Sequence, residues 1–325
     1  MSLRIGVLGA SRIAESAIVG PAAELGHRLV AVAARDPLRA ATFAEKYGVE
    51  RTLGSYTEVI EDREVDVIYN PLANALHAPW NLAAIAAGKP VLTEKPFANN
   101  REQAAEVAAA AEAAGVPVLE GFHYLFHPVT QRALELAGDG TLGPLRHIEV
   151  LMTMPEPADT DPRWSLALAG GALMDLGCYG LHIMRTLAAA AGGAPQITAA
   201  TAVQRTPGID ASCDVELSLP GGATGRASHT MVSDAYRFTL QITGDDGNAL
   251  VHNFIKPHDD DRITVTTAAG TRVERLGTRA SYTYQLEAFA AHVEDGVPLP
   301  IDTADAVANM ALIDEAYRAA GMNPR

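Results

Sequence analysis

The chain has 325 residues, a length that is comfortable for two domains. Apolar residues make up 48% of it and charged residues 20%, which is typical of a globular protein and excludes an intrinsically disordered one. Acidic residues outnumber basic ones by 39 to 25, and the net charge of -14 repels nucleic acids and anionic membranes. We therefore expect neither nucleic acid nor membrane as a partner.

Cysteine content and the apolar segments predict a cytoplasmic protein. Only Cys178 and Cys213 are present, so a disulfide framework is not implied and a four-thiolate metal site is excluded. No uninterrupted apolar run is long enough to span a bilayer. The short apolar run after Arg4 is broken by Gly6 and Gly9, which fits a first strand better than a signal peptide.

The first chemical signal is a small-residue turn that follows a predicted buried strand, Arg4–Leu8. The turn approximates Gly-x-Gly-x-x-Gly/Ala, with Ser11 in place of the middle glycine, and leads into a helical pattern. Small residues let the backbone approach a pyrophosphate, whose charge then meets the free N–H groups of the helix. A strand-turn-helix without a ligand is the alternative. The predicted dinucleotide contacts are Gly9, Ala10, Ser11, Arg12 and Ile13.

A second strand is predicted over residues 28–34, and the residues at its end indicate the cofactor. An NAD site usually has an acidic residue there, but Ala34 occupies that position. Arg35 follows, and a guanidinium suits a 2′-phosphate better than a pair of hydroxyls. Asp followed by Pro is typical of a helix start, so we expect Asp36 to cap a helix that ends near Lys46. The pattern favours NADP, with NAD as the alternative.

Strands and helices continue to alternate through the first third of the chain. Apolar runs at 65–69 and 116–121 predict further strands. One helix is expected from Pro79 to Gly88, and another from Asn100, as its N-cap, to residue 115. Alternation of this kind predicts a parallel, doubly wound sheet.

Lys95 stands where a short buried strand is expected to end. Residues 88–96 read Gly-Lys-Pro-Val-Leu-Thr-Glu-Lys-Pro, with breaking residues on both sides of an apolar run. Ligands bind at the carboxyl edge of an open parallel sheet, so we expect Lys95 to meet a substrate oxygen while Glu94 holds or balances its charge. An exposed Glu-Lys pair that caps a loop is the alternative.

The pattern changes to period-two alternation after residue 144. Strands are predicted at 214–219 and 237–242, each ahead of a glycine-containing turn. These runs predict a mostly antiparallel sheet with one face on helices. Helical spacing returns near the end of the chain, where Asp302 is expected to cap the last helix.

A second constellation consists of Asp175, Tyr179 and His182, whose offsets of four and seven bring them to one face of a helix. A lysine cation beside a tyrosine stabilises its phenolate, and a carboxylate can position the lysine, so Tyr179 would be a workable proton donor and acceptor. A buried tyrosine with an ordinary hydrogen-bond partner is the alternative. For His182, a proton relay and simple packing both stay open.

His123 and His127 have the spacing of a metal pair on a helix. No acidic residue lies between them, and Pro128 breaks a helix at once, so a hydrogen-bonding wall of the active site is predicted instead of a zinc site. Cys178 has no lysine or histidine beside it and is predicted to be a small core residue. We expect no metal.

Together these motifs resemble the glucose-fructose oxidoreductase, inositol dehydrogenase and rhizopine-catabolism family, called Gfo/Idh/MocA. The resemblance runs nearly end to end and is carried by residues 9–14, 71–77, 88–96 and 170–179. Within the family, the chain is most similar to the NADP-dependent dihydrodiol and D-xylose dehydrogenase branch over residues 33–36, 54–56 and 175–179.

The resemblance implies a Rossmann NADP-binding domain over 1–122 and a substrate-binding and oligomerisation α+β domain over 123–325, whose last helix is a candidate to pack back on the first domain. It implies hydride transfer between NADP and a sugar-like or cyclic diol substrate. Lys95 would hold the reacting oxygen, Tyr179 would exchange its proton, and Asp175 would orient Lys95. Members of the family pair through the open face of the second sheet, so a homodimer or homotetramer is expected.

Further contacts follow from the same comparison of motifs and neighbouring segments. Cofactor contacts beyond the first turn are expected from Ala34, Arg35, Pro71, Leu72, Asn74, His77, Glu94, Lys95 and His123. Substrate contacts are expected from Lys95, Tyr124, Arg163, Trp164, Tyr179 and Tyr236. Family members with histidine at the position of Tyr179 carry aspartate where His182 stands, and many relatives carry arginine at the position of Leu125, so that family contact is lost here.

Two other functions fit the resemblance. One is a nucleotide-sensing regulator, because the family includes a galactose-pathway co-repressor that binds the nucleotide without turnover. The retained Lys95 and Tyr179 argue against it. The other is an NAD-dependent inositol-type dehydrogenase. Side-chain types fit sugars, inositols and aromatic diols equally, so the expected substrate class spans all three.

Overall fold

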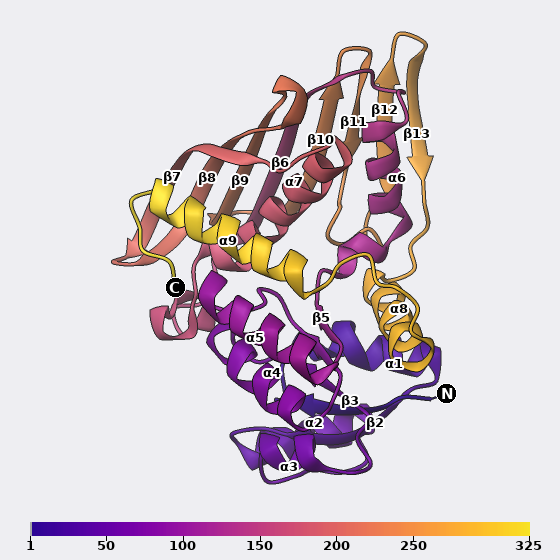
Figure 1. Cartoon of the computed structure of the whole chain (residues 1–325), viewed down its shortest axis with the longest axis vertical. Helices are drawn as coiled ribbons and strands as arrows, with labels where there is room; N and C mark the ends of the chain where they lie inside the picture. The colour runs from indigo at the N-terminus through magenta and orange to yellow at the C-terminus, as the bar shows by residue number, and fades with distance from the viewer. Residues whose placement is uncertain (1) are drawn as a thin grey trace. The chain divides into compact units, whose positions relative to one another are not determined.

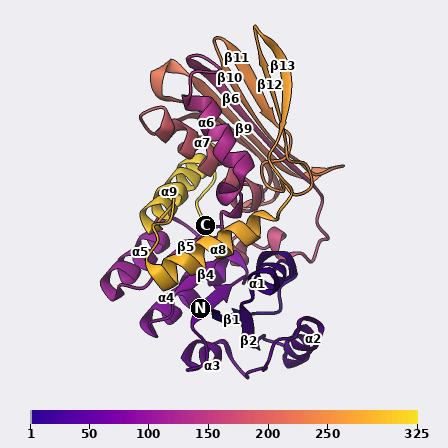
Figure 2. The same ribbon diagram turned by 90° about the vertical axis from the view of Figure 1, so that its right-hand side faces the viewer.

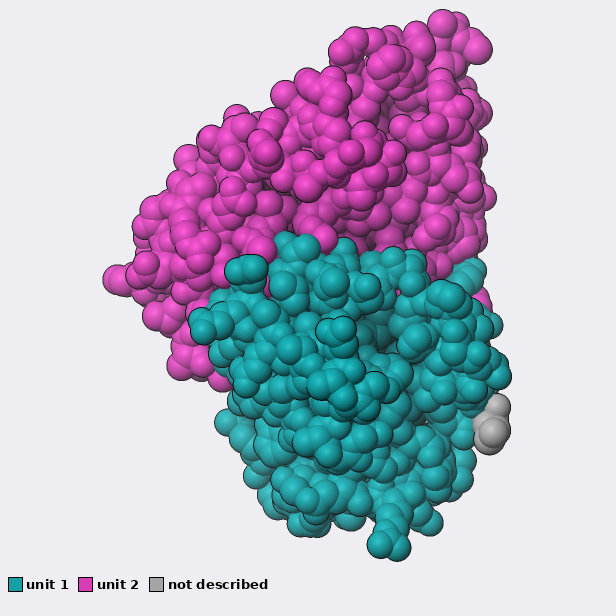
Figure 3. Space-filling view, viewed as in Figure 1, with its two compact units in different colours: residues 1–122, 282–308 teal, residues 123–281, 309–325 magenta. Residues whose placement is uncertain are grey.

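The structure, a computed structural model, describes residues 2–325. The chain forms two compact units, which Figure 3 shows in different colours. The first consists of the chain up to Phe122 together with Tyr282–Ala308, and the second of His123–Ser281 together with Asn309–Arg325. Each unit is built on one sheet (Figure 1).

A five-stranded sheet forms the core of the first unit, with the strand order β2-β1-β3-β4-β5. All its pairs are parallel, and its short apolar strands are almost completely buried, as a parallel sheet covered on both faces requires. The expected doubly wound sheet is therefore confirmed. The strands are β1 (Arg4–Leu8), β2 (Arg28–Ala33), β3 (Val67–Asn70), β4 (Val91–Thr93) and β5 (Val118–Glu120).

Helices connect these strands, and capping residues set their ends. Asp36 and Asn100 each accept a hydrogen bond from a backbone N–H of the first turn, at 2.9 and 3.0 Å, as expected for N-caps. The expected helix start at Pro79 is wrong, because α4 begins at His77 and places Pro79 in its first turn, where no N–H is needed. The helices are α1 (Gly20–Leu25), α2 (Pro37–Tyr47), α3 (Tyr56–Glu61), α4 (His77–Ala86), α5 (Arg101–Ala114) and, from Tyr282 onward, α8 (Ser281–Asp295).

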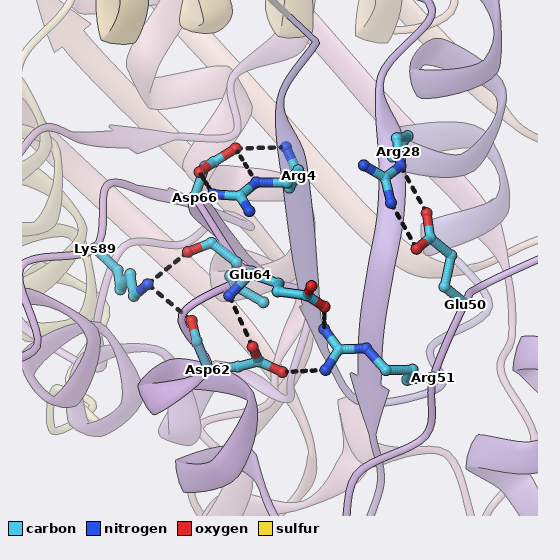
Figure 4. A network of polar contacts seen from close by, with 9 residues as sticks. Arg4, Arg28, Glu50, Arg51, Asp62, Glu64, Asp66 and Lys89 are labelled. Carbon is cyan, nitrogen blue, oxygen red and sulfur yellow. Dashed lines mark hydrogen bonds and ion pairs between the residues drawn. The ribbon is translucent and has the colours of Figure 1, made fainter.

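Charged residues fasten the amino ends of the parallel strands together (Figure 4). Arg4, at the start of β1, pairs with Asp66, which immediately precedes β3, at 2.6 Å. Lys89, just before β4, donates to the backbone carbonyls of Asp62, at 3.0 Å, and Val65. The first lysine of the 88–96 run is therefore a structural residue at the edge of the sheet opposite to the ligand-binding edge.

The second unit is built on an eight-stranded sheet with the order β13-β12-β11-β10-β6-β9-β8-β7. All neighbours are antiparallel except β6 and β9, so the expected mostly antiparallel sheet is confirmed. The strands are β6 (Leu145–Pro155), β7 (Gln196–Thr206), β8 (Ile209–Ser218), β9 (Thr224–Ser233), β10 (Arg237–Gly244), β11 (Gly247–Val251), β12 (Arg262–Thr267) and β13 (Gly270–Arg275).

Helices lie against one face of this sheet. They are α6 (Pro128–Gly138) and α7 (Cys178–Ala190), as Figure 2 shows. Alternate residues of the central strands, such as Val150 and Leu240, are completely buried. Alternate residues, such as Gln241, belong to the other face and are half-buried or exposed. The alternation matches the one-sided sheet that the sequence predicts.

One segment among residues 2–325 passes a simple length and hydropathy test for a membrane span. Leu166–Ala190 is long and apolar enough by composition to cross a membrane, but most of its apolar stretch is buried inside the protein. The segment is irregular, because a π-helix over Leu173–Gly177 precedes α7. The last helix, α9 (Thr303–Ala319), is capped by Asp302, which accepts from the N–H of Asp305 at 2.9 Å, as expected.

His229 of β9 is buried against the helical segment that contains α7. A Cβ on Gly180 would lie 2.2 Å from the His229 Nε2 atom, and one on Gly177 would lie 3.4 Å from its Nδ1 atom. These two glycines therefore leave the space that the imidazole occupies. Burial lowers the pKa of His229 to about 4, so the ring is neutral in the folded protein at neutral pH.

We expect His229 to make the protein less stable in mild acid. The unfolded chain takes up a proton near pH 6.5 and the folded one only near pH 4, so the free energy of unfolding falls as the pH drops through this window. From about pH 7 to about pH 5 the loss from this residue is about 2 kcal/mol. Urea unfolding of wild type and His229→Gln at both pH values measures it, and an equal pH dependence in the two proteins would contradict the prediction.

Candidate active site

The turn after β1 has the geometry that a pyrophosphate requires. Gly9 has a φ of +95°, a left-handed conformation that favours glycine, and a Cβ there would lie 2.8 Å from the Leu72 side chain. Its N–H donates to the carbonyl of Ala33 at 2.7 Å, which holds the turn beside the end of β2. Ala10 and Ser11 follow as small, half-buried residues. The residues present therefore fit a dinucleotide, and the individual contacts of the turn stay predictions.

Arg35 follows β2 and the half-buried Ala34, at the position expected to read the cofactor's ribose. It is exposed and forms no ion pair or hydrogen bond with any residue that the structure describes, so its guanidinium is available to a phosphate. Asp36 is occupied as the cap of α2. Sequence reasoning missed Arg39, which lies one helical turn further on and donates to the carbonyl of Ala10 at 2.9 Å. Its spacing of one turn from Arg35 was the available signal.

His77 links the loop after β3 to the loop after β4. The ring is buried, with Nε2 2.8 Å from the carbonyl oxygen of Leu72 and Nδ1 2.7 Å from that of Pro96. Burial lowers the pKa of His77. Both nitrogens face protein carbonyls, which favours a positioning role over the predicted direct cofactor contact. Of the other predicted contacts in the loop after β3, Pro71 is buried, while Leu72 and Asn74 are half-buried.

Lys95 lies beyond the end of β4 and is half-buried. Its neighbour Glu94 is 5% exposed and accepts a hydrogen bond from the hydroxyl of Tyr69 at 2.9 Å. Burial, with the Glu94 carboxylate nearby, raises the pKa of Tyr69 and of Tyr282 well above the usual value, so both stay neutral phenols. The sheet thus holds a carboxylate beside Lys95 at its carboxyl edge, the arrangement that the sequence predicts for the 88–96 run.

A cluster of aromatic and polar side chains surrounds Tyr179 in the second unit. We call Tyr179, His123, Ser281, Tyr124 and His182 the Tyr179 cluster. The hydroxyl of Tyr179 lies 3.2 Å from His123 Nε2, and His123 Nδ1 lies 2.8 Å from the Ser281 hydroxyl. All five residues are buried, with Tyr179 the most exposed of them at 5%. The predicted hydrogen-bonding wall at His123 is thus part of the environment of the acid/base candidate.

Tyr124 and His182 form a second pair within the Tyr179 cluster. The Tyr124 hydroxyl lies 2.6 Å from His182 Nδ1, and both side chains are completely inaccessible to solvent. The Tyr124 ring also packs edge-on against Tyr179, with 5.8 Å between the centroids. This burial favours a supporting role for Tyr124 over the predicted substrate contact. His182 contacts Tyr124 directly. A role of His182 in proton transfer stays a prediction.

Asp175 lies in a π-helix and not in the regular α-helix that we expected. The one-face argument assumed a regular α-helix, but Asp175 belongs to the π-helix that precedes α7, whose turns are wider. Its carboxylate accepts a hydrogen bond from Arg163 Nε at 2.7 Å, and Arg163 also pairs with Asp161 at 3.3 Å. The carboxylates raise the pKa of Arg163, which therefore stays charged. The structure thus joins two predicted site residues, Asp175 and Arg163, that the sequence did not connect.

Two predicted substrate residues have their contacts outside the Tyr179 cluster. Trp164 donates to the carbonyl of Pro157 at 3.1 Å, and its ring packs 4.3 Å from the Arg205 guanidinium. Tyr236 is 59% exposed, with the Lys256 ammonium 5.4 Å from its ring centroid. Within residues 2–325, neither side chain forms a hydrogen bond or ring contact with the cluster. Their substrate contacts stay predictions.

His127 is a helix cap. Its Nδ1 accepts from the N–H of Val129 at 3.1 Å, at the start of α6. Among residues 2–325, no group of three or more histidine, cysteine or acidic side chains is arranged to hold a metal ion. Cys178 and Cys213 are buried free thiols, and burial raises the pKa of Cys213 to about 12. The prediction that Cys178 is a small core residue is confirmed.

Two family models match the chain. One describes the NAD-binding Rossmann fold of the Gfo/Idh/MocA oxidoreductase family and matches residues 3–122. The other describes the Gfo/Idh/MocA carboxy-terminal domain and matches residues 130–250. The first matched range contains the five-stranded sheet, and the second contains strands of the eight-stranded sheet.

Individual proteins are similar over most of their length. D-xylose 1-dehydrogenase (NADP(+)) 2 of Haloferax volcanii is 32% identical over 321 residues, covering 98% of this chain and 97% of that protein. Trans-1,2-dihydrobenzene-1,2-diol dehydrogenase of Mus musculus is 32% identical over 264 residues, covering 79% and 77%. A 3-ketoreductase from Actinomadura kijaniata, crystallised with NADP and TDP-benzene, is 26% identical with a TM-score of 0.90 and 98% of each chain covered. The sequence resemblance is thereby confirmed: the chain belongs to the Gfo/Idh/MocA family of NAD(P)-binding oxidoreductases.

Proposed function

We propose that this protein is an NADP-dependent dehydrogenase or reductase that interconverts an alcohol and a carbonyl group on a sugar-like or cyclic diol substrate. Lys95 carries the proposal, because it follows β4 at the carboxyl edge of the parallel sheet, where ligands bind in such folds. The similarity to a D-xylose dehydrogenase and to a dihydrobenzenediol dehydrogenase supports the substrate class.

The proposed roles follow from the chemistry of the side chains. Bound NADP would accept or supply the hydride. The Lys95 ammonium would hold the reacting oxygen and stabilise negative charge on it, and Tyr179 would exchange the hydroxyl proton. Asp175 would orient Lys95 as well as Arg163, whose bond to it is described above. Lys95 belongs to the first unit and Tyr179 to the second, so their pairing rests on chemical argument and on the mutational test below.

A nucleotide-sensing regulator is the alternative from another class. Titration with NADPH and NADP⁺, followed by stopped-flow measurement of nicotinamide absorbance with aldoses, inositols and cyclic diols, separates the two. An enzyme oxidises or reduces members of the panel, whereas a sensor binds the nucleotide tightly and turns over none of them. An inositol-type dehydrogenase would show the same turnover with NAD and a preference for inositols.

We expect Arg35 to select NADP. If its guanidinium binds the 2′-phosphate, Arg35→Ala weakens NADP(H) binding by about 1.5–3 kcal/mol and leaves NAD(H) binding nearly unchanged. Fluorescence titration of both cofactors with wild type and variant measures this. Arg101→Ala, which removes an exposed arginine at the start of α5, is a control for the loss of positive charge. Equal affinity of the wild type for the two cofactors would contradict the assignment.

We also propose an oligomeric state and a cellular location for the protein. The alternation of buried and accessible residues across the second sheet supports a homodimer or homotetramer formed through its accessible face. Two buried free thiols support a cytoplasmic location. Sedimentation velocity measures the assembly, and a monomer at micromolar concentration would contradict the first of these proposals.

A further inference from the structure

His123 has hydrogen-bonding partners on both ring nitrogens, and both are hydroxyl groups. Nε2 lies 3.2 Å from the Tyr179 hydroxyl and Nδ1 lies 2.8 Å from the Ser281 hydroxyl. The three residues are far apart in sequence and come from a 3-10 helix, from α7 and from the first residue of α8. His123 and Ser281 are 1% and 0% exposed. A buried imidazole between two hydroxyls is a chain of groups that can each give and accept a proton.

The arrangement suits an imidazole that changes its charge without moving. In a neutral ring with the proton on Nδ1, that N–H donates to the Ser281 oxygen, and the Nε2 lone pair accepts the Tyr179 proton. In the imidazolium, Nδ1 still donates to Ser281, and Nε2 donates to the Tyr179 oxygen. Ser281 is the acceptor in both of these states, so the change of charge requires no reorganisation at Nδ1.

We propose that His123 is the proton relay of Tyr179, an inference that rests on the proposed function. In the oxidative direction, the carbon–hydrogen bond of the substrate would break and its electron pair would leave with the hydrogen as hydride, for which bound NADP⁺ would be the acceptor. The substrate's hydroxyl proton passes to the Tyr179 oxygen as the Tyr179 proton passes to His123 Nε2. The substrate becomes a carbonyl compound, Tyr179 is again a phenol, and His123 is an imidazolium that releases its proton to solvent between turnovers.

The relay explains how a phenol serves as a base near neutral pH. Free tyrosine loses its proton only near pH 10, so passing the proton on to an imidazole spares the reaction the formation of a free phenolate. Two titratable groups of the second unit adjoin the pair in the contacts described here: the ring of Tyr124 packs against Tyr179, and His182 Nδ1 lies beside the Tyr124 hydroxyl. The titrations of Tyr179 and His123 are coupled, so the pH profile reports the pair.

Two substitutions of His123 distinguish a proton relay from a residue that only positions Tyr179. His123→Gln keeps a polar side chain of suitable length that donates and accepts hydrogen bonds, but it cannot take up a proton. His123→Met fills the space with an apolar chain. We expect both to lower kcat for oxidation at about pH 7 by about 10–10²-fold, with the loss recovered as the pH rises towards 10, and with the KM values little changed. Ser281→Ala should give a smaller loss of the same kind.

Two further measurements complete the test. The solvent isotope effect on kcat should decrease in His123→Gln, because one proton fewer moves. In the protein without nucleotide, the carbon and nitrogen NMR signals of the His123 ring should titrate differently in Tyr179→Phe than in wild type, since the coupled partner is gone. His252→Met is the matched control, because His252 bonds to the Thr264 hydroxyl at 2.9 Å in the β11–β12 hairpin and should alter neither the pH profile nor the isotope effect.

The outcomes distinguish this inference from the proposed function. If His123→Gln keeps the wild-type rate and pH profile while the wild type turns over the substrate panel, His123 only positions Tyr179 and the relay is refuted. If the NMR titration of His123 does not depend on Tyr179, the relay is also refuted. If the wild type turns over no substrate, the proposed function fails, and the NMR titration still decides whether the two residues are coupled.

Discussion

Replacing Tyr179 with phenylalanine is expected to lower kcat by about 10²–10⁴-fold with the fold unchanged. The substitution removes one hydroxyl, which is the proposed proton carrier, and leaves the ring that packs against Tyr124 and His123. Cofactor affinity should stay near the wild-type value. Steady-state kinetics with the best substrate of the panel, together with near-ultraviolet circular dichroism, would measure both expectations.

His182→Asn tests the competing assignment. His182 Nδ1 lies 2.6 Å from the Tyr124 hydroxyl, so the variant changes a buried pair beside Tyr179 and keeps the Tyr179 side chain itself. If Tyr179→Phe keeps near-normal turnover and His182→Asn abolishes it in a folded protein, the acid/base role belongs to His182 and our assignment is wrong.

The second large effect is expected at Lys95. A lysine that stabilises the developing alkoxide acts mainly in the transition state, so Lys95→Met should lower kcat by about 10²–10³-fold, as when one preorganised donor is removed from an oxyanion site. Affinity for NADP should change little. Turnover and nucleotide titration of the purified variant measure the two quantities separately.

Lys89→Met is the matched control, because it removes a lysine from the other end of the same strand. Lys89 holds the carbonyls of Asp62 and Val65 at the amino edge of the sheet, away from its ligand-binding edge. We expect a loss of stability of about 1–3 kcal/mol, from two carbonyls left without their charged donor, and an unchanged kcat per folded molecule. A fall in kcat equal to that of Lys95→Met would mean that the Lys95 effect is not specific to the site.

The losses of kcat caused by Lys95→Met and by Tyr179→Phe should not be additive. Lys95 is proposed to act partly by making Tyr179 more acidic, so the variant with both substitutions should be scarcely slower than the slower single variant. Additive losses would show that the residues act independently. This comparison also tests the pairing of two side chains that belong to different units.

Short sequence patterns correctly predicted the strands, the helix caps and the parallel sheet. The short apolar run before Lys95 became β4, and Asp-Pro at 36–37 became the capped start of α2, because a strand end or a helix cap is decided by residues next to one another. Alternating strands and helices likewise predicted the parallel sheet, since each run buries its own apolar face against its neighbours.

Contacts between distant residues could not be predicted in this way. Ser281 lies 158 positions from His123. Neither segment contains a sequence pattern that predicts a hydrogen bond between the imidazole and the hydroxyl. The bond from Arg163 to Asp175 was missed for the same reason, and the π-helix was missed because the spacing argument assumed a regular helix. His77 was assigned to the cofactor from its motif, whereas two backbone carbonyls face its ring nitrogens.

Transfer of deuterium from substrate to cofactor in a single turnover tests the central claim most directly. Wild-type protein with bound NADP⁺ is mixed with a panel substrate deuterated at the carbon to be oxidised, and the reduced nicotinamide is analysed by mass spectrometry. We predict that the deuterium appears in NADPH, and that its transfer is slowed by about 10²-fold or more in both Lys95→Met and Tyr179→Phe, although each still binds NADP. Tight NADP binding with no deuterium transferred from any substrate of the panel would contradict the account.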